Sequence, residues 1–225
     1  MAVPGLSIYG DGSAVLAGGH GVRAVTEVVS LERTSVNLTG LGGMVRPADR
    51  AGLFLPGLSL DQPNVTDLPT TEVELFTADG HHRHLSAYAL DFTEHEGQLP
   101  AASQRGRAAL RRFLQEVKGL TRSTQRHPYQ PERYALLTDR FTSDDAKPAS
   151  GVPAPWPVGD LSAARPLEPT GERCLVVDGA DALRLGRLLA AGEVRNTQVW
   201  TAGLGGPLVR VVIRPLLPDQ RTCER

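Results

Sequence analysis

The clearest hydrophobic pattern in the chain lies between Ser103 and Leu120. Apolar side chains recur there at helical spacing, and charged side chains fill most of the positions between them. The apolar positions are Leu110, Phe113, Leu114 and Val117, and the charged ones are Arg105, Arg107, Arg111, Arg112 and Glu116. Ser103 is suited to cap the first turn, and Gly119 is suited to end the helix. The pattern predicts an amphipathic helix over 103–120 whose arginines face solvent.

Alternation of polar and apolar residues predicts a β-hairpin over 70–90. The stretch 71–77 alternates, 78–81 has the composition of a turn, and 82–90 returns. Other β-rich runs predict a hairpin over 6–16 and strands over 23–31 and 134–138. The chain is therefore rich in short strands and hairpins.

The C-terminal third has the pattern of a complete αβ unit. It predicts a strand over 174–177, a helix over 180–191 and a hairpin formed by 198–204 and 209–216. The only two cysteines, Cys174 and Cys223, lie at the two ends of this unit. Their placement favours a disulfide that ties the C-terminal tail to the first strand, and two buried free thiols are the alternative. By loop entropy such a bridge would stabilise the fold by roughly 4 kcal/mol.

Two segments lack a clear pattern. Between residues 35 and 53, glycines and a proline interrupt any long helix, which leaves at most a short helix over 47–51 that ends at Gly52. The stretch 142–169 is rich in proline and is unsuited to regular structure. We expect it to be a surface excursion that Trp156 pins to the protein and that contains one turn of helix near 159–163.

Strands, hairpins and a few helices predict an α+β fold, with a mixed or antiparallel sheet and helices on one face. The 225 residues are enough for a single domain, 1–225, with a hydrophobic core. Strand, helix and hairpin follow one another in both parts of the chain. Two similar β-α-β-β halves, 1–122 and 132–225, are therefore an alternative description of the same domain.

Composition narrows the class of partner. The chain is 40% hydrophobic and 22% charged, with a formal net charge of −1. Without a basic face, nucleic acid and anionic membranes are disfavoured as partners. No apolar run reaches the length of a transmembrane helix. Gly18–Gly21 lacks the order of glycines in a dinucleotide-binding loop, so we expect no cofactor. The expected partner is an unidentified protein or small ligand.

Three histidines are the candidate metal ligands. His82 and His84, two residues apart on a predicted strand, point to the same face and offer two imidazoles to zinc or copper. His95, between two glutamates, could fold back as a third ligand. Solvation at a polar hairpin tip is the alternative, because no H-E-x-x-H or C-x-x-C motif accompanies these histidines. No catalytic residue is predicted, and the chain has no G-x-S-x-G motif.

A set of ordered motifs carries a resemblance to a known group. The motifs are Ser7–Gly12, Asp67–Thr71, Leu75–Gly80, Ser86–Leu90, Cys174–Asp181, Trp200, and Arg214–Asp219 followed by Thr222 and Cys223. In this order they resemble a group of uncharacterised, secreted or lipid-anchored actinobacterial proteins. The resemblance covers most of the chain, and its C-terminal motif is the most specific part. It implies an extracytoplasmic compartment and a disulfide, and no particular reaction.

These observations favour a non-catalytic, extracytoplasmic binding or interaction module. We expect an export leader that lies outside this sequence, and a cytoplasmic protein is the alternative. A second hypothesis is a metal-binding protein or metal-dependent hydrolase that uses His82, His84 and His95. A third is an inhibitor or immunity-type protein whose segment 142–169 inserts into a partner.

Overall fold

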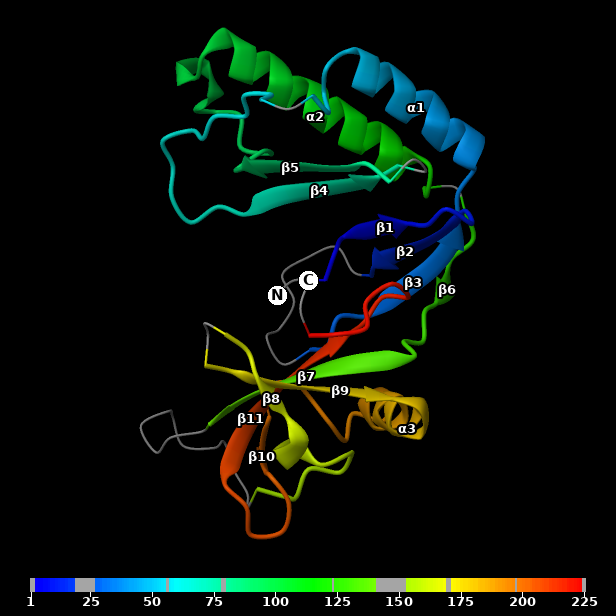
Figure 1. Cartoon of the computed structure of the whole chain (residues 1–225), viewed down its shortest axis with the longest axis vertical. Helices are drawn as coiled ribbons and strands as arrows, with labels where there is room; N and C mark the ends of the chain where they lie inside the picture. Colours follow the sequence, from blue (N-terminus) through cyan, green and yellow to red (C-terminus); the bar gives the residue numbers. More distant parts are fainter. Residues whose placement is uncertain are drawn as a thin grey trace. The chain divides into compact units, whose positions relative to one another are not determined.

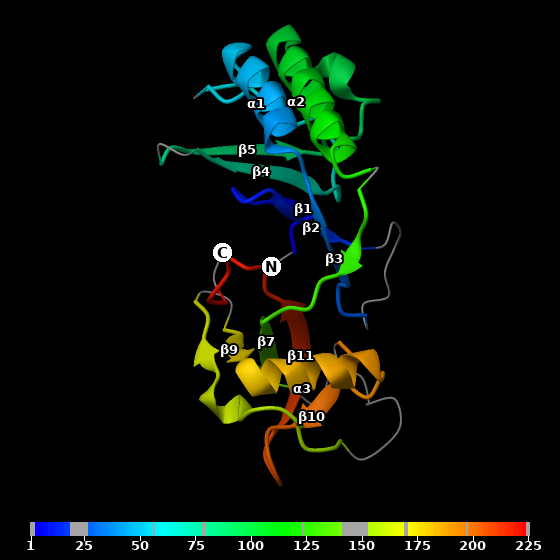
Figure 2. The same cartoon turned by 90° about the vertical axis from the view of Figure 1, so that its right-hand side faces the viewer.

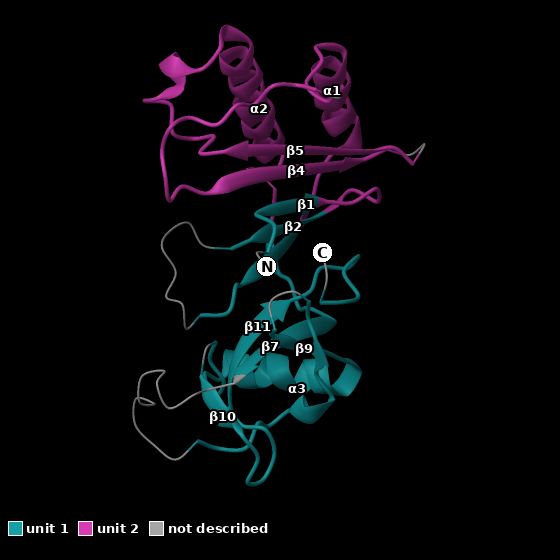
Figure 3. Cartoon of the chain, turned by 60° about the vertical axis from the view of Figure 1, so that its left-hand side comes forward, with its two compact units in different colours: residues 1–7, 14–33, 126–225 teal, residues 8–13, 34–125 magenta. Residues whose placement is uncertain are grey.

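The computed structural model describes residues 3–18, 27–55, 57–77, 80–122, 124–140, 153–168, 171–196 and 198–223. This part of the chain has the predicted α+β fold, with three α-helices and several antiparallel sheets. It divides into two compact units (Figure 3). The first unit comprises residues 1–7, 14–33 and 126–225, and the second comprises 8–13 and 34–125. The organisation of the chain as a single domain stays a prediction.

Two helices and a hairpin build the second unit (Figure 1). Its elements are α1 (Leu38–Arg50), β4 (Thr70–Phe76), β5 (His82–Tyr88), the short helix η1 (Glu96–Gln98) and α2 (Ala101–Gly119). Strands β4 and β5 pair antiparallel, which confirms the predicted hairpin. Figures 1 and 2 show α1 and α2 side by side over one face of the hairpin. Leu85 and Ala87 are buried on that face.

Helix α1 corrects the prediction of at most a short helix within residues 35–53. The Asn37 Oδ1 caps it by accepting hydrogen bonds from the N–H groups of Thr39, at 2.9 Å, and Gly40, at 3.4 Å. Pro47 lies inside the helix and not at its start. Gly52, with φ +85°, ends the helix as predicted. The cap and the packing of α1 against α2 offset the low helix propensity of its glycines.

Replacing Gly43 with alanine is expected to raise the free energy of unfolding of the second unit by about 0.5–1 kcal/mol, because alanine loses less conformational entropy in a helix. A Cβ at Gly43 would meet no atom within 4 Å. The matched control is Gly106→Ala in α2, where a Cβ would lie 3.0 Å from the Ser59 main-chain oxygen. Urea unfolding should show the gain only for Gly43→Ala. A gain at Gly106 as large as that at Gly43 would contradict the packing described for α2.

Helix α2 confirms the strongest pattern in the sequence and corrects its start. It begins at Ala101 after Pro100, and Leu110, Phe113 and Val117 are buried as predicted. Ser103 does not cap the helix. It lies inside the first turn, fully buried, where its hydroxyl donates a hydrogen bond to Asp61.

The first unit is built on a five-stranded sheet in the order β10-β11-β7-β9-β8, whose neighbouring strands are antiparallel. The strands are β7 (Arg133–Arg140), β8 (Arg165–Pro166), β9 (Arg173–Asp178), β10 (Val199–Thr201) and β11 (Leu208–Pro215). Helix α3 (Gly179–Ala190) packs on β9 and β7. Leu136, Leu185 and Val211 lie fully buried in the core of this unit. The predicted C-terminal strand, helix and hairpin are all present.

A four-stranded sheet contains β1 (Leu6–Ile8), β2 (Ser13–Ala17), β3 (Leu31–Ser35) and β6 (His127–Pro128), in that order. The strand predicted over 23–31 lies partly outside the described residues, and the strand present begins at Leu31. Strand, helix and hairpin do follow one another twice along the chain. Their pairing differs, however, because β10 and β11 join the sheet of β9, whereas β4 and β5 form a sheet of their own.

The proline-rich segment is described from residue 153 to 168, and residues 141–152 lie outside the described part. Trp156 is buried, and its ring packs edge-on against Trp200 with centroids 5.4 Å apart. The Trp156 Nε1 donates a hydrogen bond to the Val158 main-chain oxygen. The predicted turn of helix is η2 (Leu161–Ala163). Trp156 therefore anchors this segment in the core of the first unit.

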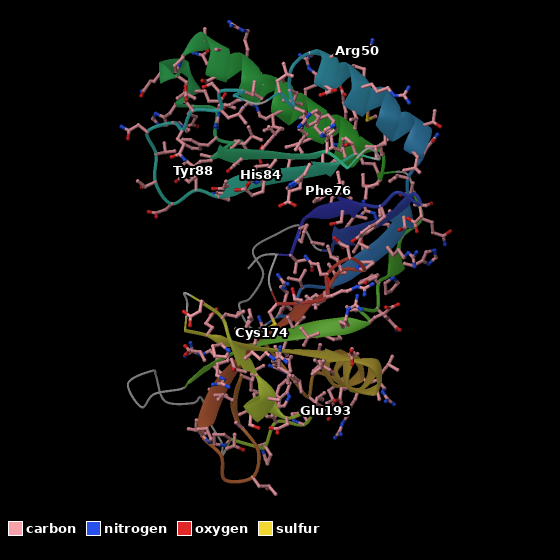
Figure 4. The ribbon with its side chains drawn as sticks, in the orientation of Figure 1. Arg50, Phe76, His84, Tyr88, Cys174 and Glu193 are labelled. Carbon is pink, nitrogen blue, oxygen red and sulfur yellow. A yellow bond between two sulfur atoms is a disulfide. The ribbon has the colours of Figure 1, made fainter. Side chains whose placement is uncertain are left out.

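Cys174 on β9 and Cys223 in the C-terminal tail form the predicted disulfide (Figure 4 labels Cys174). Cys174 is buried beside Ala135 and Leu216. In the sheet register it lies opposite Leu137 of β7 and Arg165 of β8, so the bridge fastens the tail to β9, the strand between them. The chain has no free cysteine.

Candidate functional site

The outer edge of β5 carries main-chain groups that point away from β4. Thr77 and His81 form a hydrogen-bonded pair, in which the Thr77 N–H donates to the His81 main-chain oxygen. Along an antiparallel hairpin, hydrogen-bonded pairs alternate with non-hydrogen-bonded pairs, and His82, His84 and Ser86 belong to the non-hydrogen-bonded pairs. The N–H and C=O groups of His82, His84 and Ser86 therefore face outward. Among the described residues no hydrogen bond forms to these main-chain groups. Strand β5 thus presents an unpaired edge.

A cleft of about 540 Å³ lies along this edge. One side is formed by residues 82–86 of β5, and the other by residues 54–55 and 57–61, which follow helix α1. All of the lining residues belong to the second unit. Figure 4 shows Tyr88, His84 and Phe76 spaced along the hairpin, and the cleft follows the stretch of β5 that contains His84.

The wall opposite β5 contains the apolar side chains of Phe54, Leu58 and Leu60, and it is held by α2. The Phe54 ring packs edge-on against Phe113, with centroids 5.2 Å apart. Leu58 and Leu60 lie over Gly106, where a Cβ would stand only 3.3 Å from each leucine. The glycine in α2 therefore lets the segment 54–61 approach the helix closely.

Asp61 lies at the Tyr88 end of the cleft. The Arg107 Nη1 donates to the main-chain oxygens of both Asp61, at 3.4 Å, and Tyr88, at 3.0 Å. The Asp61 carboxylate accepts a hydrogen bond of 2.6 Å from Ser103 Oγ, which is 2.8 Å from Ser59 Oγ. Hydrogen bonds from Ser103 and then Ser59 hold the pKa of Asp61 below its ordinary value. This exposed carboxylate is therefore charged at neutral pH.

A buried charge cluster supports the same end of β5. It corrects the prediction of solvent exposure for Arg107 and Arg111, whereas Arg105 and Arg112 are exposed as predicted. Arg107 is fully buried, and its Nε lies 2.5 Å from Glu96 Oε1. Arg111 pairs with both oxygens of Glu96, at 2.5 and 2.8 Å. The same two arginines donate to the main-chain oxygens of Ala89 and Leu90, each at 2.8 Å. The cluster therefore fixes the chain where it leaves β5.

Acidification is expected to remove the contribution of Glu96 to stability. Burial raises the pKa of Glu96, but hydrogen bonds and charge from Arg111 and Arg107 outweigh it, and the net pKa lies below the ordinary value. The stabilisation is therefore complete above the unfolded-state pKa and is lost as pH falls through the lower folded-state pKa. Urea unfolding should show Glu96→Gln less stable than the wild type at neutral pH, with a difference that narrows in acid.

The control for this pH series is Glu116→Gln, which changes an exposed glutamate on the same helix. Its difference from the wild type should stay small across the same pH range. A Glu96→Gln difference that is constant with pH would contradict the role assigned to the cluster.

His82 and His84 lie on the exposed face of the hairpin, each beside a glutamate of β4. His84 Nε2 is 2.6 Å from Glu72 Oε2, and His82 Nε2 is 3.7 Å from Glu74 Oε2. The His82 ring also stacks on Phe76, with centroids 4.4 Å apart. The two histidines share one face, as the spacing predicts.

The third predicted ligand, His95, lies in the turn before η1 and stacks on Phe92, with centroids 5.5 Å apart. Within the described ranges, no group of three His, Cys, Asp or Glu side chains could hold a metal ion. His82, His84 and His95 therefore do not come together as a three-ligand group.

The cleft itself has no signature in the sequence. Its two sides are more than twenty residues apart along the chain, and their approach depends on how 54–61 packs on α2. The buried arginine did have a signal. Arg107, Leu110 and Leu114 follow one another at i, i+3 and i+7, so helical spacing alone places Arg107 on the apolar face.

Comparison of the chain with protein-family models, with curated proteins and with solved structures finds no match. None of the helices in the described part combines the length and hydrophobicity of a membrane-spanning helix.

The fold and the cleft define a disulfide-bonded α+β protein in which an unpaired strand edge lies beside a wall that contains apolar side chains.

Proposed function

We propose that the protein is a non-catalytic, extracytoplasmic binding module whose second unit holds the ligand. The observation that carries the proposal is the cleft of about 540 Å³ beside the unpaired edge of β5. Its walls offer main-chain hydrogen-bonding groups and apolar side chains, which are the means by which proteins hold a ligand in place. Asp61 and Arg83 add charged groups to the cleft.

The disulfide supports the extracytoplasmic part of the proposal. Disulfides persist in oxidising compartments and are rare in the reducing cytosol. The bond between Cys174 and Cys223 uses both cysteines of the chain. The resemblance of the motifs to secreted or lipid-anchored actinobacterial proteins points to the same compartment, and membership of that group is part of the proposal.

The test uses protein recovered from fractionated source cells without reducing agent. Intact mass before and after reduction should show a gain of two hydrogen atoms, and the chain should be in the extracytoplasmic fraction. Chemical cross-linking of intact cells before fractionation should join the chain to a specific partner. A chain found in the cytoplasm with two free thiols would overturn the compartment, and turnover of a substrate by the purified chain would overturn the non-catalytic assignment.

A further inference from the structure

We propose that the second unit binds an extended peptide segment of a partner protein as an added strand along the outer edge of β5. The inference rests on the binding function proposed above and deepens it. The outward N–H and C=O groups of His82, His84 and Ser86 repeat at every second residue. An extended peptide is the ligand whose own donors and acceptors repeat with this spacing, and addition to a sheet edge is a known mode of recognition.

Side chains of the added strand would alternate between two environments. Those on the helix side enter the cleft between Arg83 and Leu85 of β5 and the wall that contains Phe54, Leu58 and Leu60. Those on the other side join the exposed face of the hairpin, beside His84 and its polar neighbours. The peptide that fits therefore alternates apolar and polar residues.

Within the described residues strand β4 also has an unpaired edge, since the hairpin is a two-stranded sheet. The two edges differ in what lies beside them. The cleft is lined by residues 82–86 of β5 and by no residue of β4. Apolar side chains of a ligand therefore find a wall only at β5, and this difference selects the edge.

Charge further specifies the ligand. The Asp61 carboxylate is exposed at the Tyr88 end of the cleft, and its neighbours Ser59 and Ser103 are uncharged hydroxyl donors. Arg83, which also lines the cleft, lies toward the other end of β5. A lysine or arginine at the end of the bound segment would pair with Asp61. The partner segment is thus extended, alternating and basic at one end.

The first experiment compares two proline variants by titration with a soluble synthetic peptide that alternates valine and serine and carries a terminal lysine. His84→Pro removes one of the three outward N–H groups of β5. Glu74→Pro is the matched control, because Glu74 is the register partner of His84 and its N–H points to the opposite edge. Proline is tolerated at such edge positions. We expect His84→Pro to weaken binding by about tenfold or more, and Glu74→Pro to bind like the wild type.

Equal binding by His84→Pro and the wild type would overturn the inference. So would a loss confined to Glu74→Pro. If His84→Pro does not fold, N-methylation of the peptide gives the same answer with the wild-type chain. Two peptides are compared, one methylated at its odd-numbered residues and one at its even-numbered residues. Methylation of the set whose N–H groups face β5 should abolish binding, and methylation of the other set should be tolerated. Tolerance of both methylated peptides would overturn the inference.

The terminal lysine has its own test. Moving lysine from one end of the peptide to the other should change the affinity of the wild type and leave the affinity of Asp61→Asn unchanged. Equal affinity of the wild type for both peptides would overturn the role of Asp61. A wild-type chain that binds neither peptide would overturn the inference as a whole. The binding function proposed above would not be overturned by that result, because the cross-linking experiment tests it separately.

Discussion

Removing the disulfide by replacing Cys174 and Cys223 with serine is expected to lower the free energy of unfolding of the first unit by about 4 kcal/mol. The two cysteines are 49 residues apart in the sequence, and opening this loop returns its entropy to the unfolded chain. Cys174 and Cys223 also pack in the cluster that contains Ala135, so loss of the bridge frees the tail from this cluster. Urea unfolding of the double variant measures the loss.

The wild-type chain under reducing conditions is the control for this variant. It should lose a similar amount of stability, since the same loop is opened. The second unit should unfold at unchanged urea concentration, because neither cysteine belongs to it. A double variant as stable as the oxidised wild type would contradict the role given to the bridge.

Replacing Arg107 with methionine is expected to lower the free energy of unfolding of the second unit by about 3–5 kcal/mol, the usual cost of breaking a buried ion pair. The guanidinium is fully buried, and it bonds Glu96 and the main-chain oxygens of Tyr88 and Ala89. Methionine keeps much of the volume but leaves these carbonyl groups without their donor. Thermal or urea unfolding followed by circular dichroism measures the loss.

Arg112→Met is the matched control, because Arg112 is an exposed residue of the same helix. A surface change of this kind should alter stability by no more than about 0.5 kcal/mol. Similar losses for the two variants would contradict the distinction between a buried and an exposed arginine on α2.

Sequence reasoning succeeded where one local pattern decides the structure. The amphipathic spacing around Leu110 and Phe113 predicts α2, and alternation predicts the hairpin of β4 and β5. The placement of two cysteines around one αβ unit favoured the disulfide over two free thiols, and the structure contains the bond. In each case the signal lies in a short stretch of chain or in a single pair of residues.

Sequence reasoning failed where structure distant in the chain outweighs local preference. The glycines of α1 lower helix propensity, but the Asn37 cap and the packing on α2 decide the outcome. Arg107 has the charge of a surface residue, yet Glu96 compensates that charge in the interior. The cleft depends on Leu58 and Leu60 packing over Gly106, a contact that has no periodic pattern in the sequence.

The measurement that tests the account most directly is hydrogen exchange of individual main-chain amides in the full chain, with and without the valine–serine peptide. The His84 N–H faces away from β4, whereas the Arg83 N–H faces the ladder. We predict that Arg83 is protected in both states and that His84 becomes protected only with the peptide bound. Fast exchange at His84 in the saturated complex, or new protection at Glu74 instead, would contradict the assignment of β5 as the binding edge.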